Sequence, residues 1–256
     1  MQITPPFGYG EIVPLEKHHR VLLPASGNAG TVPDFAKRVN AMAISFSEFA
    51  IAQRDYPIVF ATADSGQTYA PVAVLGLADC QNLFIDEHER WAEGAYVPAF
   101  VRRYPFCISR IFNDGVAQDE RLVCVEKSYV DASGIAMFNA AGLASDAWAE
   151  RERLLAEYEK DLDLTAQMCS HFASLGLFAP FTMQVKNGDT AGLTMQGMHC
   201  IDEAKFAAQD AAEHRTLAVK GLAARLYAHL FSLGNFSRLV DRALAQDARR
   251  RASRRA

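Results

Sequence analysis

The residues best suited to chemistry gather in one stretch, from Trp91 to Phe106, where aromatic rings, prolines and two adjacent arginines follow one another. A guanidinium group stacks on aromatic rings and binds a carboxylate or a phosphate through paired hydrogen bonds. One interpretation is therefore a pocket for an anion or a peptide beside a sheet. In the other, the rings anchor the core and the arginines pair with acids. The candidate ligand-binding residues of this stretch are Trp91, Tyr96, Arg102, Arg103 and Tyr104.

Motifs of the common nucleotide-binding and hydrolytic sites are absent from the sequence. Neither GxGxxG nor GxxxxGK[ST] occurs, and the GxSxG pattern of a nucleophile elbow is missing as well. Carboxylates do cluster at Asp114, Asp119 and Glu120, and again at Asp161 and Asp163. We expect these side chains to face solvent, as most charged side chains do. We therefore assign no catalytic residue.

The seven histidines do not follow a metal-binding motif, since CxxC and HExxH are both absent. His18 and His19 are adjacent, and adjacent residues on regular structure point apart. His88 lies among charged residues from Asp86 to Arg90, a pattern typical of a solvated loop. We assign no metal ligand and no cofactor. The alternative that stays open is a non-haem, oxygenase-like site whose histidines are far apart in the sequence.

Bulk composition indicates an intracellular globular protein. The net charge is −4, but five arginines lie in the last eight residues, and removing them leaves −9. Such an acidic body disfavours nucleic-acid binding, which needs basic surface. The five cysteines are odd in number and widely spaced, as reduced thiols are. With no signal peptide and no apolar run of about 20 residues, we expect a cytoplasmic protein without a membrane span.

Short apolar runs between turn signals predict a mostly antiparallel sheet in the first half of the chain. Strands are expected at 56–61, 69–77, 82–85, 106–112 and 121–126, with turns at 64–67 and 113–115. Pro98 and Pro105 limit any helix in the aromatic stretch to the short run between them, because the residue before a proline resists the α region. The stretch should be a constrained connector that leads into a strand.

After Gly142 the apolar spacing becomes helical. One long amphipathic helix is predicted from Ser145 or Asp146 towards His171, followed by a hairpin with an Asn-Gly turn at 187–189. Helices at 202–209, 213–233 and 236–245 close the chain. The segment from Leu226 to Leu239 is distinctive, and we interpret it as packing rather than as a site. The fold class is α+β, with an extended arm at 1–14, one domain at 15–246 and a basic, disordered tail at 247–256.

Five motifs occur together in one order: YPIVF at 56–60, PVAVLGL at 71–77, NLF at 82–84, YVPAFVRRYPF at 96–106 and SLGNF at 232–236. In this combination the chain resembles the SapC family of bacterial proteins, from about Leu15 to Arg242. The family is named after a surface-layer gene locus. Its members tend to occur near genes for outer-membrane receptors, flavin-dependent halogenase-like proteins and cupin-like oxygenases. Tyr56, which opens the first motif, joins the candidate ligand-binding residues.

The resemblance implies no catalytic residues. We therefore expect a non-catalytic binding or accessory protein that holds a peptide, an anionic small molecule or a partner enzyme at the aromatic and arginine-rich surface. The alternative is the metal-dependent modifying enzyme described above. Nothing in the sequence fixes the oligomeric state.

Overall fold

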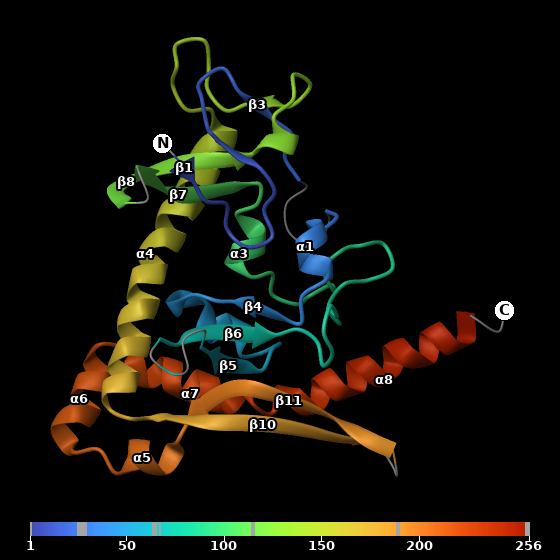
Figure 1. Ribbon diagram of the computed structural model, residues 1–256, viewed down its shortest axis with the longest axis vertical. Coiled ribbons are helices and arrows are strands. Elements are labelled where there is room, and N and C mark those ends of the chain that lie inside the picture. Colours follow the sequence, from blue (N-terminus) through green and yellow to red (C-terminus); the bar gives the residue numbers. More distant parts are fainter. Residues whose placement is uncertain are drawn as a thin grey trace.

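The computed structural model describes residues 2–24, 30–62, 66, 68–113, 116–187 and 190–253. Within these residues, antiparallel strands form two main sheets and one small sheet, and a long helix, α4 (Asp146–Ser174), runs alongside both main sheets (Figure 1). This arrangement is the expected α+β class. The centres of the expected turns at 64–67, 113–115 and 187–189 lie outside the described residues.

The first sheet has the order β1-β7-β8-β2. Its strands are β1 (Gln2–Ile3), β7 (Phe106–Asn113), β8 (Val116–Glu126) and β2 (Ile12–Pro14). Because β1 and β2 pair with the two outer edges of the central hairpin, the described residues of the expected arm, 2–14, contribute strands to the sheet. Tyr9, between the two strands, is buried and donates a hydrogen bond from Oη to the Phe106 carbonyl oxygen at 2.8 Å. The expected arm is extended, yet it is built into the body.

The second sheet has the order β10-β11-β5-β6-β4 and combines early and late parts of the chain. Its strands are β10 (Phe178–Asn187), β11 (Thr190–Ile201), β5 (Ile58–Ala61), β6 (Ala70–Val74) and β4 (Ala41–Ala43). His199 of β11 pairs with Phe60 of β5, which joins the late hairpin to the early strands. The third sheet pairs β3 (Arg20–Val21) with β9 (Ile135–Ala136). The expected strand at 82–85 is wrong, since only Ile85 forms an isolated bridge, with Trp91.

The helices begin and end at recognisable signals. Ser145 caps α4, where its Oγ accepts a hydrogen bond from the Trp148 amide at 3.3 Å, and Gly176 follows the helix with a φ of 65°. Gly221, with a φ of 70°, divides the helix expected at 213–233 into α6 and α7. The shorter helices are α1 (Asp34–Lys37), α2 (Phe49–Ala52), α3 (Ala99–Arg102), α5 (Glu203–Ala207), α6 (Ala211–Val219) and α7 (Leu222–Ser232), with 3₁₀ turns η2 (Phe46–Glu48) and η3 (Lys127–Tyr129).

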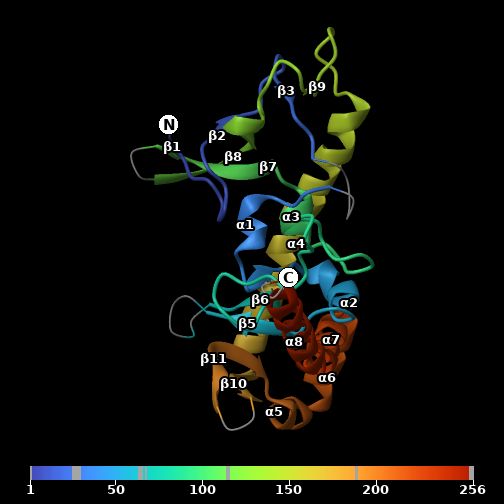
Figure 2. The same cartoon turned by 90° about the vertical axis from the view of Figure 1, so that its right-hand side faces the viewer.

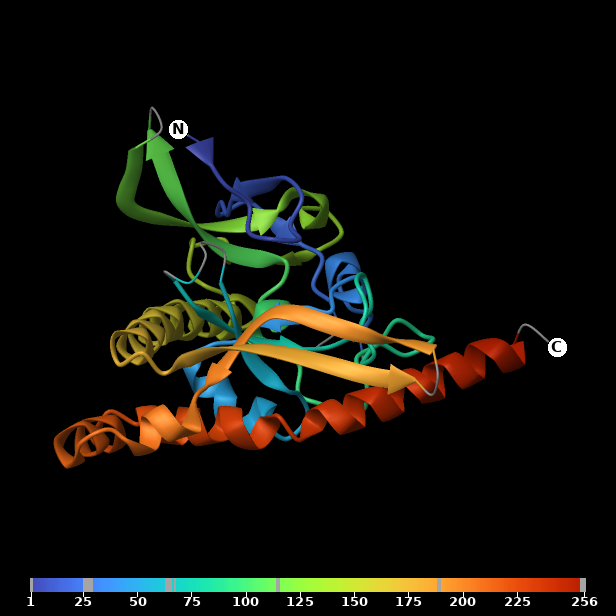
Figure 3. The ribbon, with the colours of Figure 1, turned by 60° about the horizontal axis from the view of Figure 1, so that its bottom comes forward.

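The last helix, α8 (Asn235–Ser253), extends away from the body (Figure 3). It continues through residues 247–253, for which we expected no regular structure. Alanine and arginine, which dominate this segment, are among the best helix formers, and this favours continuation of the helix. Residues 254–256 lie outside the described part of the chain. None of the helices within the described residues combines the length and apolar character needed to cross a bilayer.

Two apolar cores lie along α4. The smaller one contains Val21, Phe106, Val125, Met137, Trp148 and Leu155. The larger one fills the space around the second sheet and includes Met168 and Phe172 from the later turns of α4. Helix α7 packs on β5 and β11, while α1 and α3 lie between the two main sheets (Figure 2). The aromatic connector thus passes through the region where the two halves of the molecule meet.

Candidate functional site

The connector from Trp91 to Phe106 has the predicted constrained form. Helix α3 is a single turn between Pro98 and Pro105, the Tyr104–Pro105 bond is cis, and β7 starts at Phe106. Arg102 and Arg103 occupy consecutive positions at the end of this turn. Because consecutive helical residues are rotated by about 100°, their side chains leave the backbone in different directions. The two arginines therefore have separate environments.

Arg103 points into the core. Its side chain is 5% exposed, and its guanidinium lies over the rings of Phe100 and Tyr158, 4.5 and 4.8 Å from the ring centroids. One nitrogen lies 3.9 Å from Glu159. These contacts are those of an arginine that pairs with rings and an acid of the body. Arg103 does not line the cavity described below.

Arg102 faces outward. Its Nε donates to the Val97 carbonyl oxygen at 3.0 Å, and its Nη2 donates to Tyr96 Oη at 2.9 Å. Among the described residues no carboxylate lies within ion-pair distance of this guanidinium, although it stacks 5.5 Å from the centroid of the Tyr96 ring. Arg102 is thus held in one orientation by neutral acceptors, and it forms no direct ion pair within the described part of the chain.

A buried carboxylate fixes the direction of these hydrogen bonds. Glu48 is 3% exposed, and its Oε1 accepts from Tyr96 Oη at 3.0 Å and from the Ala99 amide at 2.7 Å. Its Oε2 accepts from the amide and the hydroxyl of Ser45 at 2.7 and 2.8 Å. Since Tyr96 gives its single hydroxyl proton to Glu48, its oxygen is left to accept from Arg102. Arg102 therefore donates to Tyr96 and Tyr96 donates to Glu48, and this directed chain of hydrogen bonds positions the guanidinium.

Arg102 lies on the wall of a cavity of about 330 Å³ between the connector, the segment around Pro33 and α4. The apolar part of the wall consists of Pro24, Val32, Pro33, Trp91, Val97, Val101 and Leu154. The charged part consists of Arg102, Arg151, Arg153, Glu150 and Glu157, and Gly30, Thr31 and Tyr104 complete the lining. A cavity of this size, with apolar walls and convergent charged groups, is typical of small-ligand sites.

The remaining candidate residues divide between the cavity and its support. Trp91 and Tyr104 line the cavity, and burial raises the pKa of Tyr104 above its ordinary value. Trp91 is 2% exposed, and its Nε1 donates to Tyr56 Oη at 2.9 Å. Tyr56 is fully buried and donates in turn to the Tyr96 carbonyl oxygen. Tyr56 and Tyr96 therefore brace the connector and lie outside the cavity lining.

A family model describes nearly the whole of this architecture. The model of the SapC family matches residues 18–239, which include the connector, α4 and the start of α8. The chain belongs to the SapC family. Neither the curated proteins nor the solved structures include a match. The SapC match thus confirms the resemblance seen in the five motifs, while the site must be judged from its own geometry.

Several residues of the SapC site region escaped the sequence prediction. Glu48 could have been found through Ser45-x-x-Glu48, the signature of a capping box, which the structure contains. Arg151 and Arg153 could not, because only the tertiary fold brings α4 to the connector. Asp161 was expected to face solvent, and this is wrong: its Oδ2 accepts from the amide and the hydroxyl of Ser47 at 2.8 and 2.6 Å and lies 2.6 Å from the Ser45 hydroxyl oxygen.

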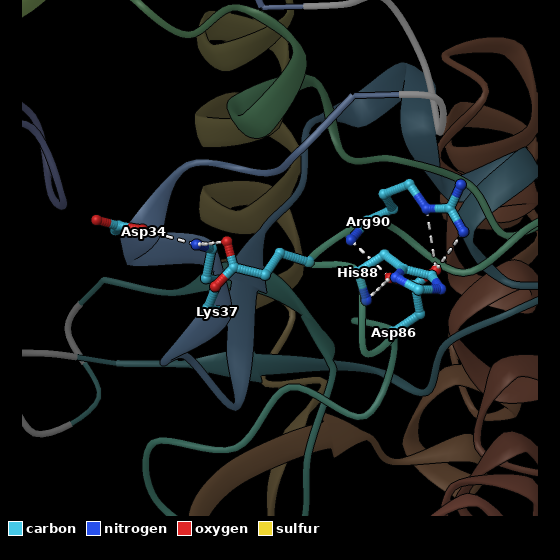
Figure 4. Close-up of polar contacts among 6 residues, drawn as sticks. Asp34, Lys37, Asp86, His88 and Arg90 are labelled. Carbon is cyan, nitrogen blue, oxygen red and sulfur yellow. Dashed lines mark hydrogen bonds and ion pairs between the residues drawn. The ribbon is translucent and has the colours of Figure 1, made fainter.

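The charged segment from Asp86 to Arg90 is a self-contained loop (Figure 4). Asp86 Oδ1 accepts from the amides of His88 and Arg90 at 2.9 and 2.8 Å, and the Arg90 amide is the main cause that lowers the pKa of this carboxyl. The His88 side chain is 65% exposed. Nearby, Lys37 bonds Asp34 at 2.8 Å and Glu89 at 2.5 Å. Backbone hydrogen bonds account for the loop without a ligand.

The segment from Leu226 to Leu239, also within the SapC match, forms a corner between α7 and α8. His229 is fully buried: its Nε2 accepts from the Ile201 amide at 3.0 Å, and its Nδ1 donates to the Ile58 carbonyl oxygen at 2.7 Å. Ser232 Oγ accepts from the Ile58 amide at 2.8 Å. Asn235 Nδ2 donates to the carbonyl oxygens of Gln53 and Tyr56 at 2.7 and 3.1 Å. These polar groups bind backbone, in agreement with a packing role.

Proposed function

We propose that this SapC-family chain is a non-catalytic binding or accessory protein. In the proposal, the cavity beside α3 holds an anionic small molecule, a peptide, or a segment of a partner enzyme. The observation that carries the proposal is Arg102, whose guanidinium is fixed by Val97 and Tyr96 and has no acidic partner among the described residues. A fixed cation on an apolar wall favours a ligand that offers a carboxylate or phosphate to it.

The charges around the cavity support a singly charged anion. Arg151 lies 3.8 Å from Glu150 and Arg153 lies 3.9 Å from Glu157, so two of the three arginines have acids of their own. The third, Arg102, lines the cavity without a direct ion pair among the described residues, and Glu48 is linked to it only through the Tyr96 hydroxyl. A carboxylate with an apolar or aromatic body would match both this charge and the Trp91 and Leu154 surface.

Trp91 offers a direct test because the chain has two tryptophans and the other, Trp148, is buried in the smaller core. In a Trp148→Phe background, the fluorescence of Trp91 should change on titration with phenylacetate, with a short peptide that ends in a free carboxylate, or with both. The matching neutral amides should produce little change. Arg102→Ala should weaken binding about tenfold or more, equivalent to about 1.4 kcal/mol.

The control variant is Arg215→Ala, which removes an exposed arginine of α6 outside the cavity lining and should leave the titration unchanged. Equal binding of acids and amides, or an unaltered titration in Arg102→Ala, would contradict the proposal. A thermal midpoint close to that of the parent verifies that each variant is folded.

The competing proposal is a metal-dependent, oxygenase-like modifying enzyme with histidines from distant parts of the sequence. Within the described residues, the one group of three metal-ligand side chains that converges lies inside a single turn, Glu16 to His19. The geometry thus favours the binding protein. Metal analysis of a Glu16→Gln, His18→Ala chain purified without chelator tests the enzyme proposal, which requires close to one equivalent of iron, zinc or copper per chain at a site other than this turn.

We further propose a cytoplasmic location in a bacterial cell and no nucleic-acid ligand. The five free cysteines support a reducing compartment, and burial raises the pKa of Cys107 to about 12 and that of Cys169 to about 12. Cell fractionation tests the location. Retention on heparin or DNA resin at low salt would contradict the second point, because binding to phosphates depends on basic surface.

A further inference from the structure

A tight turn connects β2 to β3, and none of its residues lines the cavity beside α3. The His19 amide donates to the Glu16 carbonyl oxygen at 3.0 Å, and the Glu16 amide donates to His19 Nδ1 at 3.2 Å. Strand β2 is paired with β8 on one side of the turn, and β3 is paired with β9 on the other. Both ends are therefore anchored in sheets, and the turn presents its side chains in a defined arrangement.

Three metal-ligand side chains converge on this turn. His18 Nδ1 lies 3.3 Å from Glu16 Oε2, and the rings of His18 and His19 are 4.5 Å apart at their centroids. One ligand atom from each of Glu16, His18 and His19 lies within 4.8 Å of the other two. The expectation that adjacent histidines point apart applies to regular structure, and here it is wrong because the pair lies on a turn.

The distances and donor types suit a transition metal. Two donors bound to one tetrahedral zinc at about 2.1 Å each are roughly 3.4 Å apart, close to the separation of His18 Nδ1 and Glu16 Oε2. Two imidazoles and a carboxylate select zinc, copper or nickel over calcium and magnesium, which require mainly oxygen ligands. We propose that Glu16, His18 and His19 bind one divalent transition-metal ion on the turn between β2 and β3.

Ligation through Nδ1 of His19 would replace its hydrogen bond from the Glu16 amide, whereas ligation through Nε2 would leave that bond in place. His18 and Glu16 are 72% and 60% exposed, so the metal keeps open positions for water or for a donor from another molecule. Lys17 and Arg20 flank the ligands in the sequence and oppose a cation. The Lys17 side chain, however, extends to Gly142: its Nζ lies 3.2 Å from the position that a Cβ atom on Gly142 would occupy. Micromolar rather than tighter affinity follows from this exposure and charge.

Isothermal titration of the full chain with zinc chloride tests the site directly. We expect one zinc ion per chain, with micromolar affinity at pH 8. Glu16→Gln preserves the shape of the side chain, and His18→Ala removes a side chain without a backbone hydrogen bond. Each should weaken binding about tenfold or more, a loss that even outer-sphere partners of metals can cause.

His88→Ala is the matched control, since His88 is an exposed histidine 3.7 Å from a carboxylate, that of Glu87, outside the turn. This variant should bind zinc like the parent. His19→Asn keeps a hydrogen-bond acceptor near the Nδ1 position, so that its loss of zinc would not result from collapse of the turn. The proposal is overturned if the parent produces no saturable heat, or if Glu16→Gln and His18→Ala bind zinc as tightly as His88→Ala does.

Discussion

The connector at 91–106 and the corner at 226–239 are the two most distinctive segments of the sequence, and they use polar side chains in opposite ways. In the corner, His229, Ser232 and Asn235 are buried and bind backbone groups of the strand and turn beneath them. In the connector, Tyr96 donates to the buried Glu48 of η2, and this chain of hydrogen bonds ends at Arg102, which is charged, outward-facing and without an acidic partner within ion-pair distance among the described residues.

The partners of the polar side chains distinguish a segment that packs from a segment that binds a ligand, even when both have unusual sequences. A polar group whose hydrogen bonds are consumed by backbone contributes to one folded arrangement and has little left for a ligand. A charged group that is held in place without a direct ion pair can still bind an ion from outside. Substitutions in the corner should thus cost stability, whereas substitution of Arg102 should cost binding.

The largest effect is expected for His229→Ala in the corner. The change leaves a cavity in the larger core and removes the partners of the Ile201 amide and the Ile58 carbonyl oxygen, which should lower the free energy of unfolding by about 4 kcal/mol. Urea unfolding followed by circular dichroism measures it. Phe231→Ala, on the same helix but 74% exposed, should change the same quantity by less than about 0.5 kcal/mol. Similar losses in both variants would contradict a packing role for His229.

The second effect concerns pH. Burial lowers the pKa of His229 to about 4, from an ordinary value of 6.5. The unfolded state therefore binds this proton more tightly than the native state, and the contribution to stability, about 3 kcal/mol, is lost as the pH falls from about 6.5 to 4. Unfolding in urea over this pH range tests the point. His229→Gln can make both backbone hydrogen bonds without titrating, so its stability should fall less steeply; identical slopes would contradict the assignment.

The next largest effect is expected for Arg103→Ala, which should lower the free energy of unfolding by about 2 kcal/mol because it removes a desolvated guanidinium from between aromatic rings. Arg103→Met retains much of the volume and should recover part of the loss. The thermal midpoint and urea unfolding measure both variants. A negligible loss in Arg103→Ala would show that Arg103 resembles Arg102, and the division between the two arginines would fail.

The smallest change in stability is expected for Arg102→Ala, which should lower the free energy of unfolding by less than about 0.5 kcal/mol, since its side chain is exposed.

Tyr96→Phe should lower the free energy of unfolding by about 1 kcal/mol, since it removes a donor to Glu48 and the acceptor of Arg102. If the directed chain positions the guanidinium, Tyr96→Phe should also weaken carboxylate binding while leaving binding of the neutral amides unchanged. Equal effects on acids and amides would indicate a purely structural tyrosine.

Much of the fold was accessible from local signals. Ser145 predicted the start of α4, and the two prolines predicted the single turn of α3. Pairing between distant segments was not accessible, because the joining of β11 to β5 depends on hydrogen bonds that no sequence period encodes. The capacity of β7 and β8 to accept β1 and β2 at their edges was hidden for the same reason.

The sequence indicated which segment borders the candidate cavity, but it did not indicate the different environments of that segment's residues. Composition identified the connector, and Trp91, Arg102 and Tyr104 do line the cavity. Arg103 could have been separated from Arg102 by the rotation of about 100° between consecutive helical residues. The contribution of Arg151 and Arg153 could not have been foreseen, since they lie on α4 some fifty residues later and meet the connector only in the folded chain.

Helix α4 has a mechanical consequence for the two cores that it links. With 29 residues it is a rod of roughly 44 Å, whose early turns carry Trp148 and Leu155 into the smaller core and whose later turns carry Phe172 into the larger one. Loosening either core therefore frays an element that the other core needs. We therefore expect the two halves to unfold together, which urea unfolding followed separately in each half would test.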